Sequence, residues 1–292
     1  MKASAFAYAR ATSVGHAIEL LSQHGGHAKV LSGGQSLMPA MNLRLLAPDM
    51  IVDIGALDEL RGIATQNGIL SIGALTRHVD LQNSAVIAVH APLLKQAIAH
   101  VAHPAIRNRG TIGGSLAHAD PASELPACAI ALDATIVVRG PAGERRIPAQ
   151  DFFLGIYETA LLSEELLVAI EVPLLPPNSA HYFCEFARRH GDYAIVGLAA
   201  QAVVGNQKLV DFRPVFFGVG AKAEHVKLLS LLNTEVTRHV LSDALQSLEQ
   251  ALDPPEDQQA SSAMRHHLTK VLLARCVAEL LSRPDLKSWE PA

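Results

Sequence analysis

The sequence predicts an α+β protein built from two domains. A run of helix- and strand-breaking residues, PLLPPN at 173–178, divides the chain. Before this run, short strands and helices alternate with glycine-rich loops. After it, three long strands come first and helices follow, which is the order expected for an antiparallel sheet backed by helices. We therefore expect a first domain over residues 1–176 and a second over residues 177–292.

In the first domain, apolar residues recur at helical spacing over residues 14–24, and a Gly-Gly pair follows them. Thr76 is a candidate cap for a helix that begins within residues 75–80. Pro92 suits the first turn of a helix over 91–101, which His103-Pro104 should end. The other expected elements are strands at 29–31, 50–54, 68–73, 134–138 and 166–172, a glycine turn at 111–115, a helix at 125–132, and a turn or helix start at 151–153.

The second domain begins with strands at 182–188, 194–204 and 209–219. Gly205-Asn206-Gln207 joins the last two strands and is typical of a hairpin turn. Residues 222–250 and 257–283 predict two or three helices. We expect a three-stranded antiparallel sheet with helices packed on it.

Composition excludes several classes of function. The 292 residues are 49% hydrophobic and 18% charged, and the net charge is −4, with Lys and Arg scattered along the chain. No basic footprint for nucleic acid is present. The three cysteines lie far apart and form no CxxC pair, so we expect neither a disulfide framework nor an iron–sulfur cluster on this chain.

We expect a cytoplasmic protein. The N-terminal stretch lacks the basic leader and long apolar core of a signal peptide. The longest apolar runs, such as 194–200, are too short for a transmembrane segment. Reduced thiols fit the same compartment.

A first candidate binding loop, SGGQSL, spans Ser32–Leu37 directly after a strand. Glycine permits positive φ and a close approach of a ligand to the backbone. Successive main-chain amides in such a turn can converge on an anion such as phosphate, and Ser32, Gln35 and Ser36 add neutral donors. The spacing matches neither GxGxxG nor a Walker motif, and a plain glycine turn is the alternative.

A second glycine-rich loop, RNRGTIGGS, spans Arg107–Ser115, with hydroxyl side chains on either side of its glycine pair. A diphosphate has two phosphates to bind, so two loops that both offer bare main-chain amides would suit it. For Arg107 and Arg109, surface charge or a packing salt bridge is the alternative.

Three polar residues, His118, Asp120 and Glu124, follow the second loop. Their loose spacing does not match a metal site. A carboxylate here could accept hydrogen bonds from ribityl hydroxyls of a cofactor or orient the loop. A capped turn before the next helix explains His118 and Asp120 equally well.

In the second domain, ARRHGDYA joins the first two strands. Tyr193 could stack on a flat cofactor, and the Arg188-Arg189 pair could hold the loop by charge-assisted hydrogen bonds. A charged surface loop is the alternative. The sequence contains no GxSxG, no HExxH and no defensible Cys/His dyad, so we expect no catalytic acid, base or nucleophile on this chain.

Three stretches together, AKVLSGGQSLMPAMNLRLLAPDMIVDI, IRNRGTIGGSLAHADPASELP and RRHGDYA, carry a family resemblance. In this order and at these separations, the chain resembles the medium, FAD-binding subunit of the xanthine dehydrogenase and carbon monoxide dehydrogenase family, from Tyr8 to about Ser282. The resemblance implies a vanillyl-alcohol-oxidase-type FAD-binding domain with subdomains of about 1–56 and 57–176. A C-terminal flavoprotein domain, with a three-stranded antiparallel sheet and helices, follows it.

The resemblance also implies which residues contact FAD. Lys29–Ser36 and Thr111–Ser115 match the family's two pyrophosphate loops. Glu124 matches an acid near the ribose or ribityl chain, Leu166 or Leu167 a residue beside the ring, and Tyr193 a residue that guards one ring face. The implied set is Lys29, Val30, Leu31, Ser32, Gly33, Gly34, Gln35, Ser36, Leu37, Val101, Ile106, Thr111, Ile112, Gly113, Gly114, Ser115, His118, Asp120, Glu124, Leu166, Leu167 and Tyr193, with no metal ligand.

Two positions depart from the family pattern. Residue 115 is serine where many relatives have asparagine, but serine can still donate a hydrogen bond. Relatives often carry a lysine shortly before the Arg-Arg pair, whereas Cys184, Glu185 and Phe186 occupy that stretch here.

By resemblance, a substrate is hydroxylated at a molybdenum cofactor on a large partner subunit. Electrons then pass through two-iron two-sulfur clusters on a small subunit to FAD on this chain, and on to a quinone, NAD or oxygen. The expected assembly is a dimer of heterotrimers, without nucleic acid and without a transmembrane segment. Two alternatives stay open: a stand-alone flavin oxidase with its own organic substrate, and a flavin-free scaffold subunit.

Overall fold

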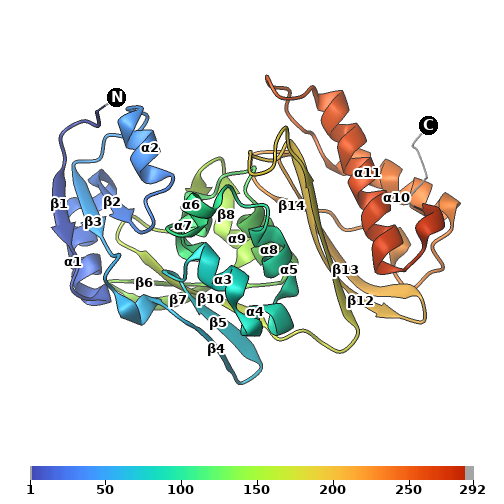
Figure 1. Cartoon of the computed structure of the whole chain (residues 1–292), viewed down its shortest axis with the longest axis horizontal. Helices are drawn as coiled ribbons and strands as arrows, with labels where there is room; N and C mark the ends of the chain where they lie inside the picture. The colour runs from blue at the N-terminus through green and yellow to red at the C-terminus, as the bar shows by residue number, and fades with distance from the viewer. Residues whose placement is uncertain (1, 287–292) are drawn as a thin grey trace.

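The computed structural model describes residues 2–286 and shows three units in a row (Figure 1). A small parallel sheet forms the N-terminal end, a larger α+β unit lies in the middle, and a sheet with two long helices forms the C-terminal end. The α+β class is therefore confirmed. Of the expected second domain, residues 287–292 lie outside the described residues.

The N-terminal unit is a three-stranded parallel sheet of order β1-β3-β2, covered by α1. The expected helix α1 is confirmed: Ser13 Oγ accepts from the His16 amide at 3.1 Å, and Gly25, at φ +52°, ends the helix. Its apolar face packs on the sheet. The elements are β1 (Ala7–Arg10), α1 (Val14–His24), a 3₁₀ turn (Gly25–His27), β2 (Ala28–Leu31), α2 (Leu37–Asn42) and β3 (Met50–Asp53).

The central unit is built on a five-stranded antiparallel sheet of order β4-β5-β10-β6-β7. Three of its strands were expected, and two were not. Asn67 and Gly68, both at positive φ, close the β4–β5 hairpin, a turn signal that the sequence carries. The bounds are β4 (Ile63–Gln66), β5 (Ile69–Gly73), β6 (Thr135–Gly140), β7 (Gly143–Pro148), β10 (Leu166–Pro173), the small hairpin β8 (Phe153–Gly155) and β9 (Glu158–Thr159), and a 3₁₀ turn (Asp58–Leu60).

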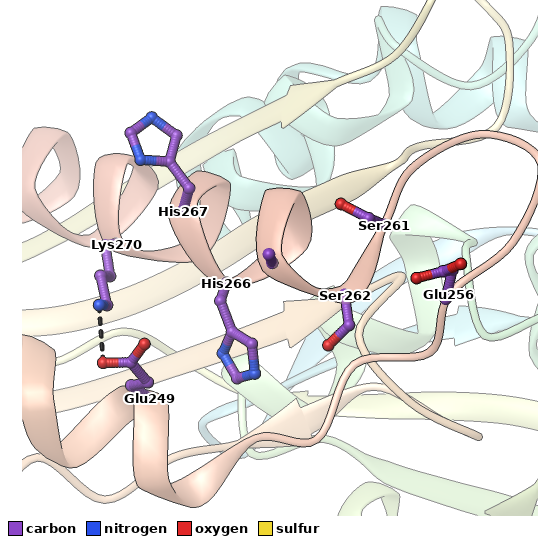
Figure 2. A pocket seen from close by; sticks show the side chains of 8 residues that line it. Glu249, Glu256, Ser261, Ser262, His266, His267 and Lys270 are labelled. Atoms are coloured by element: carbon purple, nitrogen blue, oxygen red, sulfur yellow. Dashed lines mark hydrogen bonds and ion pairs between the residues drawn. The ribbon is translucent and has the colours of Figure 1, made fainter.

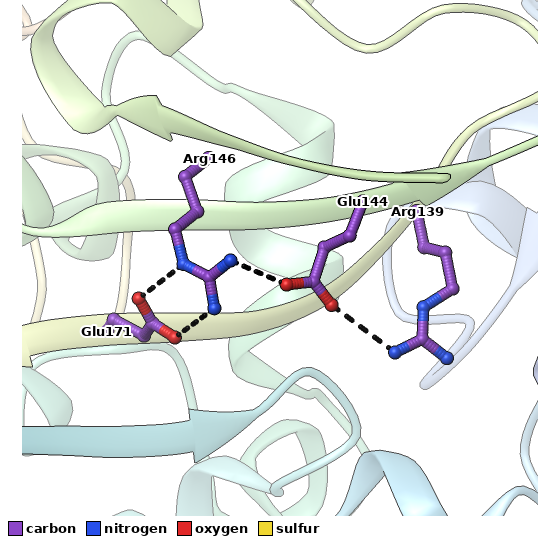
Figure 3. Close-up of polar contacts among 4 residues, drawn as sticks. All are labelled: Arg139, Glu144, Arg146 and Glu171. Atoms are coloured by element: carbon purple, nitrogen blue, oxygen red, sulfur yellow. Dashed lines mark hydrogen bonds and ion pairs between the residues drawn. The ribbon is translucent and has the colours of Figure 1, made fainter. Parts of the chain in front are cut away.

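The unexpected strand β7 is a charged edge strand. Arg146 on it pairs with Glu144 at 2.6 Å and with Glu171 on β10 at 3.1 Å, and Glu144 also pairs with Arg139 at 3.3 Å (Figure 3). Exposed pairs of this kind add little stability, but charge on an edge strand discourages pairing with another chain.

Seven helices cover one face of this sheet, and two expectations about them are wrong. Thr76 does not cap a helix, because its hydroxyl donates to the Gly62 carbonyl at 3.1 Å and α3 begins at His78. His103-Pro104 follows the end of α5 at Ile98, as expected, and Pro104 also begins a short helix, since a proline suits the first helical position. Residues 111–115 are the start of a helix instead of a turn. The bounds are α3 (His78–Asn83), α4 (Ala85–His90), α5 (Pro92–Ile98), α6 (Pro104–Arg107), α7 (Ile112–His118), α8 (Glu124–Ala131) and α9 (Ala149–Phe152).

The C-terminal unit contains the three expected long strands and a fourth short one, so the sheet is four-stranded, in the order β11-β12-β13-β14. Asn206 and Gln207, both at positive φ, confirm the expected hairpin. The expected helix at 222–250 starts later, because β14 and a 3₁₀ turn precede it. The bounds are β11 (Ser179–Phe186), β12 (Val196–Gly205), β13 (Lys208–Phe217), β14 (Glu224–His225), 3₁₀ turns (Leu229–Leu231 and Pro284–Leu286), α10 (Arg238–Ala251) and α11 (Ser262–Leu280).

Strand β12 is buried on both faces and joins the last two units. Ala199 packs into the central core with α5 and α8, whereas Leu198 and Ala200 pack on the side of α10 and α11. This double burial explains why the strand is almost continuously apolar. β10 ends at Pro173 and β11 begins in another sheet, while the exact domain bounds stay a prediction. Within residues 2–286, no helix is both long and apolar enough to span a bilayer.

A first prediction concerns Gly197 on β12, which lies directly opposite Phe217 on β13. A Cβ at Gly197 would lie 2.0 Å from the Phe217 ring, so Gly197→Ala must displace that ring. We expect a loss of about 1–3 kcal/mol and a lower thermal midpoint by circular dichroism. Gly15→Ala in α1 is the control, because its Cβ would meet only Ser13 Oγ at 3.8 Å. Equal midpoints for both variants would contradict the packing described.

Candidate functional site

The two glycine-rich loops, which lie far apart in the sequence, meet in the structure. Ser32 Oγ and Thr111 Oγ1 are 2.6 Å apart. A Cβ on Gly33 would lie 2.3 Å from the Arg109 carbonyl oxygen, so only glycine allows the two backbones to come this close. The contact joins the N-terminal unit to the central unit at the candidate site.

The first loop offers a series of bare main-chain amides. From Ser32 to Leu37, none of the amide groups donates a hydrogen bond to another atom of the described chain. Gly34 takes a φ of +71°, and the Gln35 side-chain amide donates to the Gly33 carbonyl at 2.9 Å. Consecutive free N–H groups around a left-handed residue form a nest that suits a phosphate oxygen. The expected anion-binding geometry is therefore present in this loop.

In the second loop, from Thr111 to Ser115, only the Thr111 amide lacks a hydrogen-bond partner within residues 2–286, so the expectation that this loop also offers a row of bare amides is wrong. The amides of Ile112 and Gly113 donate to the carbonyls of Thr76 and Ala74 at 3.0 and 2.9 Å. Those of Gly114 and Ser115 donate to Thr111 Oγ1 at 3.2 Å and to its carbonyl at 3.0 Å. These bonds satisfy the loop because it is the capped first turn of α7.

What the second loop supplies is a surface with small side chains. Gly113 packs on Ala74, where a Cβ would lie 2.6 Å from the alanine Cβ. A Cβ on Gly114 would point to Thr111 Oγ1 at 2.9 Å and to Ser32 Oγ at 3.7 Å. The glycine pair therefore keeps the space beside the Ser32–Thr111 contact open.

Arginines surround a cavity of about 110 Å³ beside the two loops, which Ser32, Gly33 and Thr111 also line. Arg109 was singled out from the sequence, but Arg61 and Arg77 were not, because only the fold brings them here. Arg61 is held by the Gly55 carbonyl, to which it donates at 2.7 Å. The cavity gives the site a positive potential that favours an anion.

Arg107, by contrast, has a packing role. Its Nη1 donates to the carbonyls of Val101 and Ala102 at 2.9 and 3.1 Å and so closes the end of the α5 segment. Arg107 thus holds the backbone through carbonyl groups, and no salt bridge of Arg107 is found within residues 2–286.

The residues that follow the second loop, His118, Asp120 and Glu124, form a second polar group, distinct from the one at the two loops. Asp120 is buried, accepts from the Ala122 amide at 2.9 Å, and is a partner of the Tyr157 hydroxyl at 3.3 Å. Asp120 therefore caps the turn after α7, which is the structural alternative that we gave to a contact with the cofactor. Ser115 Oγ lies 3.3 Å from Ser123 Oγ in the same turn.

Glu124 is a buried acid at the start of α8. Burial first, and then the charge of Glu185, raise the pKa of Glu124 to about 7. Glu185, which stands in the stretch where relatives often have lysine, pairs with His100 at 3.4 Å. This pair raises the pKa of His100 through its hydrogen bond to Glu185.

Tyr193 reaches the same polar group from the C-terminal unit, and it is 59% exposed. Partial burial, followed by the charges of Asp120, Tyr157 and Glu124, raises the pKa of Tyr193 to about 12. Its loop packs closely on the central unit, since a Cβ at Gly191 would lie 2.8 Å from the Ala102 carbonyl. Arg188 donates to the Gln258 carbonyl at 2.9 Å and holds the other end of the loop.

Several expected cofactor contacts lie outside these two groups. Leu166 and Leu167 are buried in apolar cores at 3% and 4% exposure, Leu166 with the N-terminal unit and Leu167 with the central one. Lys29 is exposed on β2, and Val101 and Ile106 are half-buried. Their contact with FAD stays a prediction.

A larger cavity of about 580 Å³ lies elsewhere, at the N-terminal end of α11 (Figure 2). Lys270 pairs with Glu249 at 2.7 Å across it, and His266 and Glu256 also line it. Its mixed charges do not select one kind of ligand. Within residues 2–286, no group of three or more His, Cys, Asp or Glu is arranged to hold a metal ion.

Comparison with known proteins agrees with this geometry. Residues 4–175 match the family described as the FAD binding domain in molybdopterin dehydrogenase, and residues 181–280 match the CO dehydrogenase flavoprotein C-terminal domain. The chain is 40% identical to the 6-hydroxypseudooxynicotine dehydrogenase complex subunit alpha of Paenarthrobacter nicotinovorans, over 99% of this chain and 100% of that protein. It is 43% identical to the carbon monoxide dehydrogenase medium chain of Hydrogenophaga pseudoflava, over 66% of this chain and 68% of the other.

The fold agrees as well. A solved carbon monoxide dehydrogenase from Hydrogenophaga pseudoflava, which lacks the Mo-pyranopterin moiety of its molybdenum cofactor, has a chain that superimposes with a TM-score of 0.94. The identity is 34%, and the match covers 97% of this chain and 99% of that chain. The expected resemblance is confirmed, and the chain belongs to the FAD-binding medium subunits of the molybdopterin dehydrogenase family, of the carbon monoxide and xanthine dehydrogenase type.

Proposed function

We propose that this chain holds one FAD, receives electrons from two-iron two-sulfur clusters of a small partner subunit, and delivers them to an external acceptor such as a quinone, NAD or oxygen. As a member of its family it is an oxidoreductase subunit of a molybdenum-containing dehydrogenase. The observation that carries the proposal is the row of bare amides at Ser32–Leu37. The second loop contacts this row through the Ser32–Thr111 hydroxyl pair.

The residues present fit a dinucleotide. Its diphosphate would lie on the amides of Ser32–Leu37, with the hydroxyls of Thr111 and Ser115 as further donors. The cavity arginines, Arg77 and Arg109, would neutralise its charge. The flavin supplies the redox chemistry when it is bound, and the protein positions it and excludes side reactions.

From the phosphates, the cofactor would extend toward the second polar group. Asp120 and Glu124 lie on the turn that follows α7, where carboxyl groups can accept hydrogen bonds from the ribityl or ribose hydroxyls. Tyr193 would then cover one face of the ring. The apolar members of the expected set, such as Leu167, would contact the cofactor through their side chains.

The partners proposed for this chain are a large molybdenum-cofactor subunit and a small iron–sulfur subunit, as a dimer of heterotrimers. The relatives are subunits or chains of multi-subunit dehydrogenases. Cys128 and Cys276 are fully buried in different cores, so these cysteines do not form a cluster site on this chain. The bare amides favour this function over a flavin-free scaffold.

Native mass spectrometry of the complex provides the direct test. We expect a yellow assembly in which this chain copurifies with both partner subunits and releases FAD on denaturation. FMN in place of FAD, or no uptake of FAD by the flavin-free chain, would contradict the proposed cofactor. Turnover of an organic substrate by the lone chain would instead favour a stand-alone oxidase.

The second loop is tested by Gly114→Val. The valine side chain would occupy the space beside Ser32 Oγ and Thr111 Oγ1, so the affinity for FAD should fall by far more than tenfold, or about 1.4 kcal/mol, and most purified chains should lack FAD. Flavin absorbance per chain is the measurement. Gly26→Ala is the control, since its Cβ would meet nothing within 4 Å. Full FAD occupancy in Gly114→Val would show that the loop is misassigned.

Glu124 predicts a pH dependence of stability. Its pKa is about 7 in the folded chain, against an ordinary value of 4.5, so the folded state binds more protons between these values. Stability should therefore fall as pH rises from about 4.5 to 7, and the full cost, on the order of 3 kcal/mol, should be present above pH 7.

Glu124→Gln removes this ionisation. We expect its thermal midpoint in the flavin-free chain to rise relative to wild type as pH increases from 4.5 to 8. Glu19→Gln, at an exposed carboxylate on α1, is the matched control for loss of charge. A constant difference between Glu124→Gln and wild type across this range would contradict the pKa shift.

A further inference from the structure

Tyr157 stands at the tip of the β8–β9 hairpin in an unusual conformation. Its φ is +55°, a left-handed value that is rare for a bulky residue and that often marks a functional site. The side chain is 58% exposed, and its neighbours Leu154 and Ile156 are exposed as well. An ordered hairpin that presents apolar and aromatic side chains together suggests a contact surface for a ligand.

Three contacts hold Tyr157 in place against the segment that ends the second loop. Its amide donates to the Ala119 carbonyl at 3.3 Å, its hydroxyl donates to Asp120 Oδ2 at 3.3 Å, and its ring lies 4.8 Å from that of His118 at the end of α7. Figure 1 shows β8 beside α7, the helix that begins in the second loop. The ring is therefore positioned in advance, although its outer face is exposed.

Tyr193 approaches the same carboxylate from the C-terminal unit. It is also exposed, and it is close enough to Asp120 and Tyr157 for their charges to raise its pKa. The ring contacts recorded within residues 2–286 pair Tyr157 with His118 and do not pair it with Tyr193. Two exposed aromatic side chains thus lie near one buried carboxylate without packing on each other.

We propose that Tyr157 is a flavin-contacting residue, and that it forms with Tyr193 the two aromatic walls between which the isoalloxazine ring of FAD lies. The inference rests on the proposed function, namely that this chain binds FAD. Both tyrosine rings offer a flat apolar face to a planar heterocycle, and aromatic contacts of this kind strengthen binding beyond the area buried. The exposed hairpin thereby becomes part of the cofactor site.

The test uses the full chain, freed of flavin and titrated with FAD, with ADP as a second probe that lacks the ring. Tyr157→Asn removes the ring and its hydroxyl, while asparagine tolerates the positive φ at this position. We expect this variant to bind FAD roughly 3- to 10-fold more weakly and to quench flavin fluorescence less, with ADP affinity unchanged. Tyr157→Phe keeps the ring and should bind FAD within about twofold of wild type, as expected if stacking dominates.

Tyr8→Ala is the matched control, because Tyr8 is similarly exposed, lies on β1 in a different sheet from the hairpin of Tyr157, and also donates to a carboxylate, Asp53 Oδ2 on β3, at 2.6 Å. It should leave FAD affinity and fluorescence unchanged. Wild-type values for Tyr157→Asn, or equal losses for FAD and ADP, would overturn the inference. Failure of wild type itself to bind FAD or ADP would instead overturn the proposed function.

Discussion

The close contact between Gly33 and the backbone at Arg109 and Gly110 is the constraint on which the site depends. The two loops come from units with separate sheets, one parallel and one antiparallel. Because residue 33 has no side chain, the backbones meet directly and the hydroxyls of Ser32 and Thr111 come within 2.6 Å. A side chain there would push the N-terminal unit outward and separate the donors of the first loop from those of the second.

The two loops divide their roles, although their sequences look alike. The first leaves its amides without partners, whereas the second uses them to begin α7 and presents hydroxyls and glycine surfaces. This division follows from what comes next in the chain. Thr111 caps a helix through its own side chain, while Ser36, before α2, makes no such cap bond. A glycine-rich pattern alone therefore does not tell which amides stay available to a ligand.

Much of the architecture could be predicted from local pattern. Alternating or continuous apolar residues marked β5, β10 and the three long strands, and Gly205-Asn206-Gln207 marked their hairpin. β7 escaped because its sequence, GERRIP, is charged on an exposed edge, and β4 because only Asn67-Gly68 marks its hairpin. The loops of the site were also found in the sequence, but the cavity arginines Arg61 and Arg77 and the hairpin residue Tyr157 were not. Their neighbours lie far away in the chain, so no spacing rule connects them.

The bare amides of Ser32–Leu37 also bear on how the chain should be handled when no cofactor is present. These half-buried N–H groups can donate to any small oxyanion that reaches the loop. Inorganic phosphate or sulfate offers the same oxygens as a dinucleotide. Buffers rich in these ions would therefore compete for the loop, and a choice as ordinary as the purification salt would set how readily the empty chain is loaded.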